Sequence, residues 1–220
     1  TKAVQPAQTI LAVLLPMMVV LWAFMGGMYF VMDITAGEKE RKTLEALLTT
    51  PPSRLEIVLG KYLAVLAMTL VSTVLALVGI SIGVQFETQM IAMGTAAITP
   101  ETLAVTAVSI PILAMSASAL QILVCTFARS FKEAQNYLSP LMIVFILPIT
   151  FLMYVPRTWY TTLLFLPFVS FNIILRNTIL GTLTTTELAT GISLGLIYAL
   201  IFLLLAVKAF HHEKAIFRGT

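Results

Sequence analysis

The chain has very little charge, and none of it falls within its longest apolar stretches. Charged residues make up 10% of the 220 positions and hydrophobic residues 59%, whereas soluble domains are about 25% charged and about 45–50% apolar. Five runs free of charge are long enough to cross a bilayer as helices, which takes about 20 residues. These runs are residues 10–32, 62–84, 103–128, 138–155 and 188–207. We therefore predict an all-α, polytopic membrane protein with five transmembrane helices in a single transmembrane domain, residues 1–220.

The same spans lack the charged side chains and histidines that relay ions or act as catalytic acids and bases. They contain no Asp, Glu, Lys, Arg or His, which pumps and ion-coupled carriers place at membrane depth. Cys125 is the single cysteine, so no internal disulfide can form, and the adjacent His211 and His212 are typical of a solvated tail rather than of a metal site. We predict no catalytic residue, no metal site and no cofactor in this chain. Its basic residues flank apolar runs instead of forming one basic face, which argues against nucleic acid as a partner.

A sixth apolar run, "TTLLFLPFVSFNIIL" at residues 161–175, is shorter and contains Pro167 and Asn172. Its length favours a re-entrant or interfacial helical segment over a span. We predict that residues 161–180 form this segment on the outer side of the membrane.

The distribution of Lys and Arg predicts the orientation. With five spans, one side receives the loops 33–61 and 129–137 and the tail 208–220, which together carry ten basic residues, while the other side carries only Lys2, Arg157 and Arg176. The positive-inside rule makes the first side cytoplasmic. Residue 1 is then outside and the C-terminus inside. Since the chain opens with Thr1 and without a secretory signal, we expect an earlier span upstream of it.

Some polar and small residues interrupt the spans. "GISIG" (Gly79, Gly83) and "GISLG" (Gly191, Gly195) carry the spacing of small residues that allows helices to approach closely. In the third span, polar side chains form a stripe that predicts hydrogen bonds between helices or, alternatively, the lining of a substrate path. These residues are Ser116, Ser118 and Gln121.

The charge missing from the spans is concentrated in "GEKERKTLEALLTTPPSRLEIVLGK", residues 37–61, which holds nine charged residues. Apolar residues at helical spacing predict an amphipathic helix after the first span, and Pro51 and Pro52 end it. "SRLE" at 53–56 is a capping box that begins a new helix extending to about Val84, longer than the membrane is thick. The short helix is either an interfacial helix under the lipid headgroups or a docking element for a partner.

The run "GEKERKTLEALLTTPPSRLEIVLGKYL", followed by "ARSFKEAQNYLSPL", resembles the type-2 permeases of ATP-binding-cassette (ABC) exporters, nearest to the NatB-like group associated with sodium export. The resemblance implies that the first segment is a coupling helix contacting a separate nucleotide-binding ATPase subunit. It would assign this contact to Glu38, Arg41, Thr43, Leu44, Glu45, Leu47, Leu48, Pro51 and Arg54. The second segment would be another cytoplasmic loop, containing Arg129, Lys132, Glu133 and Asn136.

The resemblance further implies that ATP and Mg²⁺ bind the ATPase subunit, that two permease copies or homologous halves pair, and that the protein lies in the plasma membrane. The leading hypothesis is therefore a non-enzymatic permease subunit, with sodium as the exported substrate. Amphipathic drugs, peptides or lipids are alternative substrates. A membrane scaffold without transport is an alternative function, and a membrane-embedded enzyme is disfavoured by the missing catalytic side chains.

Overall fold

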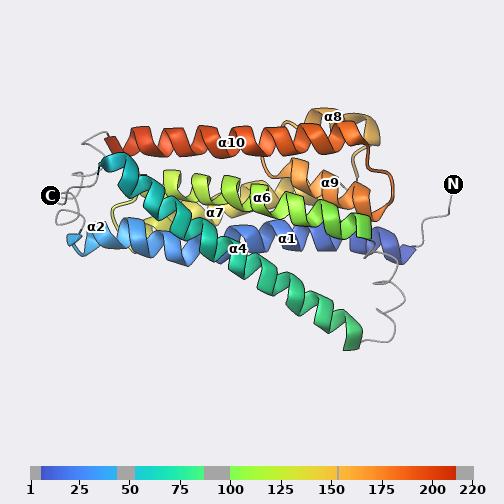
Figure 1. Cartoon of the computed structure of the whole chain (residues 1–220), viewed down its shortest axis with the longest axis horizontal. Helices are drawn as coiled ribbons and strands as arrows, with labels where there is room; N and C mark the ends of the chain where they lie inside the picture. The colour runs from blue at the N-terminus through green and yellow to red at the C-terminus, as the bar shows by residue number, and fades with distance from the viewer. Residues whose placement is uncertain (1–5, 44–52, 87–99, 153, 212–220) are drawn as a thin grey trace.

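Helices make up all the regular structure in the computed structural model, which describes residues 6–43, 53–86, 100–152 and 154–211. The first long helix continues into a five-residue π-helix and a short α-helix, and a group of short helices precedes the last long one (Figure 1). The elements are α1 (Pro6–Met32), the π-helix (Asp33–Gly37), α2 (Glu38–Glu40), α4 (Arg54–Phe86), α6 (Pro100–Phe127), α7 (Phe131–Phe151), a 3₁₀ turn (Arg157–Trp159), α8 (Tyr160–Leu163), α9 (Val169–Ile179) and α10 (Thr185–His211).

Five of these helices are long and apolar enough to cross a membrane, namely α1 with its π-helical and α2 extension, α4, α6, α7 and α10. They correspond one by one to the five predicted runs, so the predicted fold class is confirmed. All five begin before the uncharged runs. The difference is largest for α4, which begins at Arg54, and for α7, which begins at Phe131. Charged residues are tolerated in such terminal turns since they extend beyond the hydrocarbon. Residues 131–137, predicted as part of a loop, therefore form the first turns of α7.

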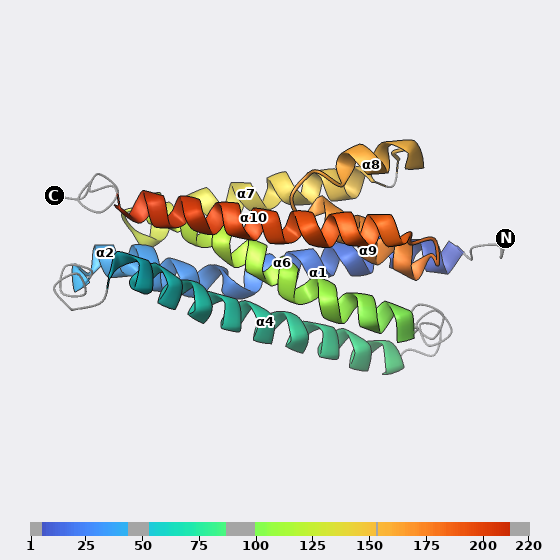
Figure 2. The ribbon, with the colours of Figure 1, turned by 45° about the horizontal axis from the view of Figure 1, so that its top comes forward.

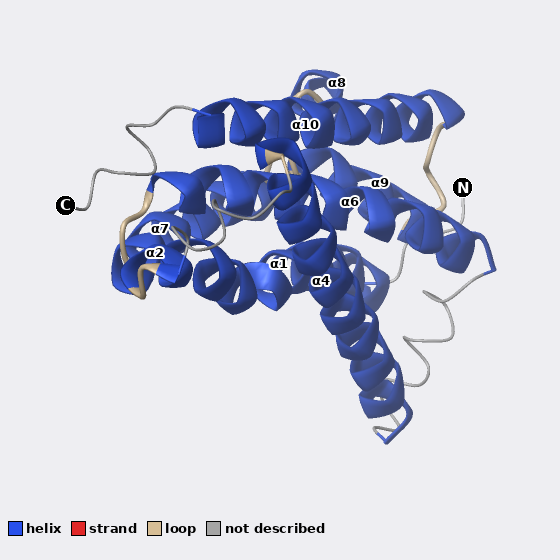
Figure 3. Ribbon diagram, turned by 60° about the vertical axis from the view of Figure 1, so that its left-hand side comes forward, coloured by secondary structure: helices blue, strands red, loops and turns tan. Residues whose placement is uncertain are grey.

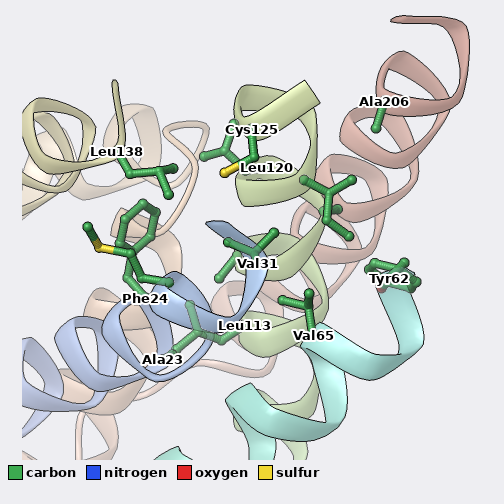
Figure 4. Close-up of a cluster of buried hydrophobic side chains, with 14 of the residues drawn as sticks. Ala23, Phe24, Val31, Tyr62, Val65, Leu113, Leu120, Cys125, Leu138 and Ala206 are labelled. Carbon is green, nitrogen blue, oxygen red and sulfur yellow. The ribbon is translucent and has the colours of Figure 1, made fainter. Parts of the chain in front are cut away.

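Helix α6 is the centre of the bundle. It packs against α1, α4, α7, α9 and α10 and is the most buried of the five long helices. Figure 2 shows α4 on one side of this centre and α7 with α8 on the opposite side. The core joins apolar side chains of several helices, among them Phe24 of α1, Val65 of α4 and Leu113 of α6 (Figure 4). One main core therefore holds the five long helices and α9 together, and a smaller separate cluster surrounds α8.

Glycines mark where helices approach most closely. A Cβ added at Gly26 of α1 would lie 2.6 Å from Ser72 Cβ of α4, and one added at Gly195 of α10 would lie 2.8 Å from Ile112 of α6. Gly191, one turn before Gly195, would clash with Ile174 of α9. The predicted close contact at "GISLG" is thus confirmed. At Gly79 the prediction is wrong within this chain, because a Cβ there would meet nothing within 4 Å.

Helix α4 packs along only part of its length. It crosses α1 obliquely and its last turns stand away from the bundle, and Figure 3 shows the same divergence from another side. Consistent with this, four apolar side chains in the C-terminal half of α4 are exposed: Val74, Leu75, Val78 and Ile82. The tight crossing with α1 is therefore the main attachment of α4 in mid-span.

The sixth apolar run is divided into short helices, and it is not among the five candidate spans. Helices α8 and α9 are separated by a turn in which Phe168 has φ 68°. Every residue of α9 except Arg176 is buried. The Arg176 guanidinium donates to the Leu152 carbonyl at 3.0 Å and lies 5.4 Å from the centre of the Tyr160 ring. Arg176 thereby joins α9 to the end of α7 and to α8. The location of residues 161–180 on the outer side of the membrane stays a prediction.

Candidate functional site

Charged residues are concentrated in residues 33–43, 53–61 and 126–133. These segments lie at one end of the bundle, where α1 continues into α2, α4 begins and α6 turns into α7 (Figure 1). We call this region, residues 33–43, 53–61 and 126–133, the charged end. The start of α4 within it is fixed by the predicted capping box. The Ser53 amide donates to Glu56 Oε2 at 2.7 Å, and the Glu56 amide donates to Ser53 Oγ at 3.3 Å. Two amides that lack helical partners are satisfied in this way.

The segment after α1 differs from the predicted amphipathic helix. Its helix ends at Glu40, and Lys42 adopts φ 59° in a turn closed by its amide on the Lys39 carbonyl at 3.1 Å. A left-handed residue cannot continue a right-handed helix, so the predicted helix is interrupted at Lys42. Its predicted end at Pro51 and Pro52 lies outside the described residues. Arg41 forms an exposed ion pair with Asp33, and Thr43 Oγ1 donates to the Glu38 carbonyl at 3.2 Å. Five further residues predicted for this contact lie outside the described residues: Leu44, Glu45, Leu47, Leu48 and Pro51.

The three residues of α2 each bond a different helix. Glu38 forms an ion pair with Lys61 of α4, in which the Lys61 side chain is only 9% exposed. The Lys39 ammonium donates to the Thr126 carbonyl and, at 3.1 Å, to the Ala128 carbonyl, both at the end of α6. Glu40 Oε2 accepts from the Phe131 amide, at the start of α7, at 2.9 Å.

These contacts follow from the electrostatics of helix ends. The last carbonyls of a helix carry partial negative charge and the first amides partial positive charge. Lys39 therefore caps the C-terminus of α6 while Glu40 caps the N-terminus of α7. A rotation or displacement of α2 would act on α4, α6 and α7 together.

The connection between α6 and α7 is short and has its own cap. The Glu133 amide donates to Ser130 Oγ at 3.2 Å, and Glu133 Oε2 accepts from the Arg129 amide at 2.7 Å. The Phe131 ring stacks on Tyr29 of α1 at 6.5 Å between centroids. Among the residues predicted for this second loop, Arg129, Lys132 and Asn136 are exposed, and Arg54 at the start of α4 is half-buried. The contact role of these residues stays a prediction.

The predicted polar stripe of α6 is buried against its neighbours. Ser118 Oγ donates to Thr69 Oγ1 of α4 at 3.2 Å, and Gln121 Nε2 donates to the Phe24 carbonyl of α1. Ser116 Oγ bonds within its own helix, to the Leu113 carbonyl at 2.9 Å. Two of the three side chains thus join α6 to the helices that cross at Gly26. As the lining of a substrate path, all three remain a prediction.

Sequence reasoning missed the central members of the charged end, Lys39, Glu40 and Lys61. Their partners lie far away along the chain, 87 residues from Lys39 to Thr126 and 91 from Glu40 to Phe131. The cap at Ser130–Glu133 did carry a readable signal, since Ser-x-x-Glu opens α7 as it opens α4. Among the residues described, no group of three or more His, Cys, Asp or Glu is placed to hold a metal ion.

Five apolar helices tied at one end by a charged junction are the architecture of a multi-pass membrane protein. The chain belongs to the ABC-2 family: residues 2–215 match the model described as "ABC-2 family transporter protein". It is 30% identical over 208 residues to the ABC transporter permease protein NatB of Bacillus subtilis (strain 168), an alignment covering 93% of this chain and 54% of that protein. The chain spans about half the length of this relative, and no solved structure gave a significant match.

Proposed function

We propose that this chain is the part of an ABC exporter permease that receives the force of ATP hydrolysis from a separate ATPase subunit. The charged end is the receiving surface, on the cytoplasmic side. The observation that carries the proposal is the bonding of α2, whose three consecutive side chains hold α4, α6 and α7. A partner that moves this short segment thereby moves three membrane helices.

The direct docking contact would include residues 44–52, where the resemblance puts Leu47 and Leu48. ATP and Mg²⁺ would bind the ATPase subunit, and two permease copies would complete the transporter. Sodium is the substrate we propose first, on the resemblance to the NatB-like group. The charge-free spans suit amphipathic drugs, peptides or lipids as well, so the substrate has to be identified by stimulation of ATP hydrolysis and by flux.

The decisive experiment uses the full-length permease reconstituted with its ATPase subunit in proteoliposomes. Leu47→Asp with Leu48→Asp should abolish binding of the ATPase and substrate-stimulated ATP hydrolysis, because two charges would replace the apolar docking contact. The matched control places the same change at the far end of the bundle, Tyr154→Asp with Trp159→Asp, where the side chains are 83% and 62% exposed. This control should still bind the ATPase.

Two results would contradict the proposal. If the Leu47 and Leu48 variant retains substrate-stimulated hydrolysis at the wild-type rate, the docking assignment is wrong. If the wild type binds an ATPase whose inhibition leaves the biological activity intact, the scaffold function replaces transport. Sodium fails as the substrate if amphiphiles stimulate hydrolysis and sodium does not.

A further inference from the structure

The π-helix between α1 and α2 stands at the point where motion of the charged end would enter the membrane. Residues 33–37 form one wide turn, after which the helix resumes as α2. π-helices are rare and occur mostly as single turns inserted in α-helices, frequently at functional sites. Such a turn accommodates one residue more than an α-helical turn would. The orientation of Glu38, Lys39 and Glu40 therefore depends on whether residues 33–37 are π-helical or α-helical.

Lys61 holds the wide turn from the α4 side. Its ammonium donates to the Ile34 carbonyl, inside the π-helix, and to Glu38 Oε2, directly after it. On the exposed side, Asp33 and Arg41 form an ion pair that spans the same turn. Gly37 leaves room for this pair, because a Cβ there would lie 3.2 Å from Asp33 Oδ1. One basic side chain on each side of the π-helix thus stabilises it.

One group within the turn is poorly satisfied. The Thr35 hydroxyl is buried, with the residue 2% exposed, and finds no hydrogen-bond partner among the residues described. A buried hydroxyl without a partner raises the free energy of the conformation that contains it. The Lys61 contacts therefore stabilise a turn that the buried Thr35 hydroxyl destabilises. Opposing contributions of this kind keep two conformations of the segment close in free energy.

We propose that residues 33–37 are a register switch between π-helix and α-helix, and that Lys61 is the positioning residue that holds the π-helical state. This inference rests on the proposed function, since it describes how the docked ATPase acts on the membrane helices. Conversion to α-helix rotates the following residues by about 100°, the angle of one residue in a helix. Glu38, Lys39 and Glu40 are consecutive, so one conversion releases α4, the cap of α6 and the cap of α7 at once.

The first test deletes Thr35. The shortened segment can close as ordinary α-helix while keeping α2 in the orientation seen here, because the one additional residue of the wide turn is gone. The full-length variant with its ATPase subunit should bind the ATPase and hydrolyse ATP, yet lose at least about tenfold of its transport per ATP hydrolysed. Deletion of Ala67, in the regular helix of α4, is the matched control for the effect of losing one residue and should impair folding instead.

The second test measures the register directly. Lys42 and Gln135, which are exposed and outside the predicted ATPase contact, are replaced by spin-labelled cysteines in a Cys125→Ser background. Distances are recorded for the full-length permease with its ATPase, without nucleotide and with ATP and vanadate. A rotation of about 100° at the rim of a helix about 10–12 Å wide displaces a side chain by about 8 Å. We expect two distance populations that exchange weight with nucleotide in the wild type, and one population after deletion of Thr35. Lys61→Met should populate the second distance without nucleotide, whereas Lys61→Arg should restore the wild-type pattern.

The outcomes separate the two proposals. If wild-type permease binds no ATPase or transports nothing, the proposed function is wrong. If the wild type transports and the Thr35 deletion transports equally well, or if one distance persists in every nucleotide state, the register switch is refuted while the proposed function stands. Equal distance distributions in Lys61→Met and Lys61→Arg would refute the role of Lys61.

Discussion

Replacing Gly26 by alanine should force α1 and α4 apart at their crossing. The added Cβ would lie 2.6 Å from Ser72 Cβ and 3.1 Å from Ser72 Oγ. Non-bonded carbons rest about 3.5–4.0 Å apart, so the backbones have to separate by about 1 Å. No rotamer change relieves the clash, because both carbons are attached directly to Cα atoms.

The expected cost can be separated from the effect of alanine on the helix itself. Overpacking of a well-packed contact costs about 1–3 kcal/mol, while alanine in place of glycine stabilises a helix by about 0.8–1.0 kcal/mol. Gly79→Ala is the matched control, since a Cβ there meets nothing within 4 Å. Only the stabilising effect of alanine on the helix applies to this variant. The two variants should therefore differ in stability by about 1–3 kcal/mol.

This difference is measured by thermal unfolding of the detergent-purified variants. Size-exclusion chromatography after heating gives the fraction of each variant that stays folded. Taking about 2–4 °C per kcal/mol for chains of this length, Gly26→Ala should unfold roughly 2–12 °C below Gly79→Ala. The double variant Gly26→Ala with Ser72→Gly removes the side chain that the added methyl group would meet, and should recover most of the loss. Equal midpoints for Gly26→Ala and Gly79→Ala, or the absence of any recovery in the double variant, would refute the close crossing.

Three further changes test other contacts. Ser53→Ala should destabilise the start of α4 by about 0.5–2 kcal/mol, seen as faster amide exchange in its first turn, and Ser53→Asp should restore the protection. Gln121→Glu should lower the yield of folded protein and its thermal midpoint far more than Gln121→Met, since a charged side chain at membrane depth costs about 2.5–3.5 kcal/mol. Lys39→Met should reduce transport per ATP hydrolysed while ATPase binding persists, because Lys39 caps α6 (3.1 Å to the Ala128 carbonyl). Unchanged coupling in that variant would contradict the role of the cap.

Much of the architecture could be predicted from the sequence because the governing interactions are local or concern the solvent. A charge-free run of about 20 residues forms a membrane helix whatever its neighbours, since its backbone groups can be satisfied only within the helix. The cap at Ser53–Glu56 joins residues three apart and was predictable for the same reason. The length of the sixth run, with its Pro167 and Asn172, predicted a re-entrant or interfacial helical segment rather than a span, and the run is not among the five candidate spans.

Only the tertiary structure decided which helices the charged residues join and where helices come into close contact. Lys39 and Glu40 could be placed on a helix from sequence, but their partners at Thr126, Ala128 and Phe131 depend on how α6 and α7 pack. "GISIG" and "GISLG" have the same spacing, yet a Cβ at Gly191 or Gly195 would meet another helix, whereas one at Gly79 would meet nothing within 4 Å. The close contact at Gly26 and the π-helix at 33–37 arise in the same way, because long-range packing selects among local conformations of similar free energy. The sequence therefore determined the helices and the expected sides of the membrane, and the packing of α6 against its neighbours determined the junction through which they are joined.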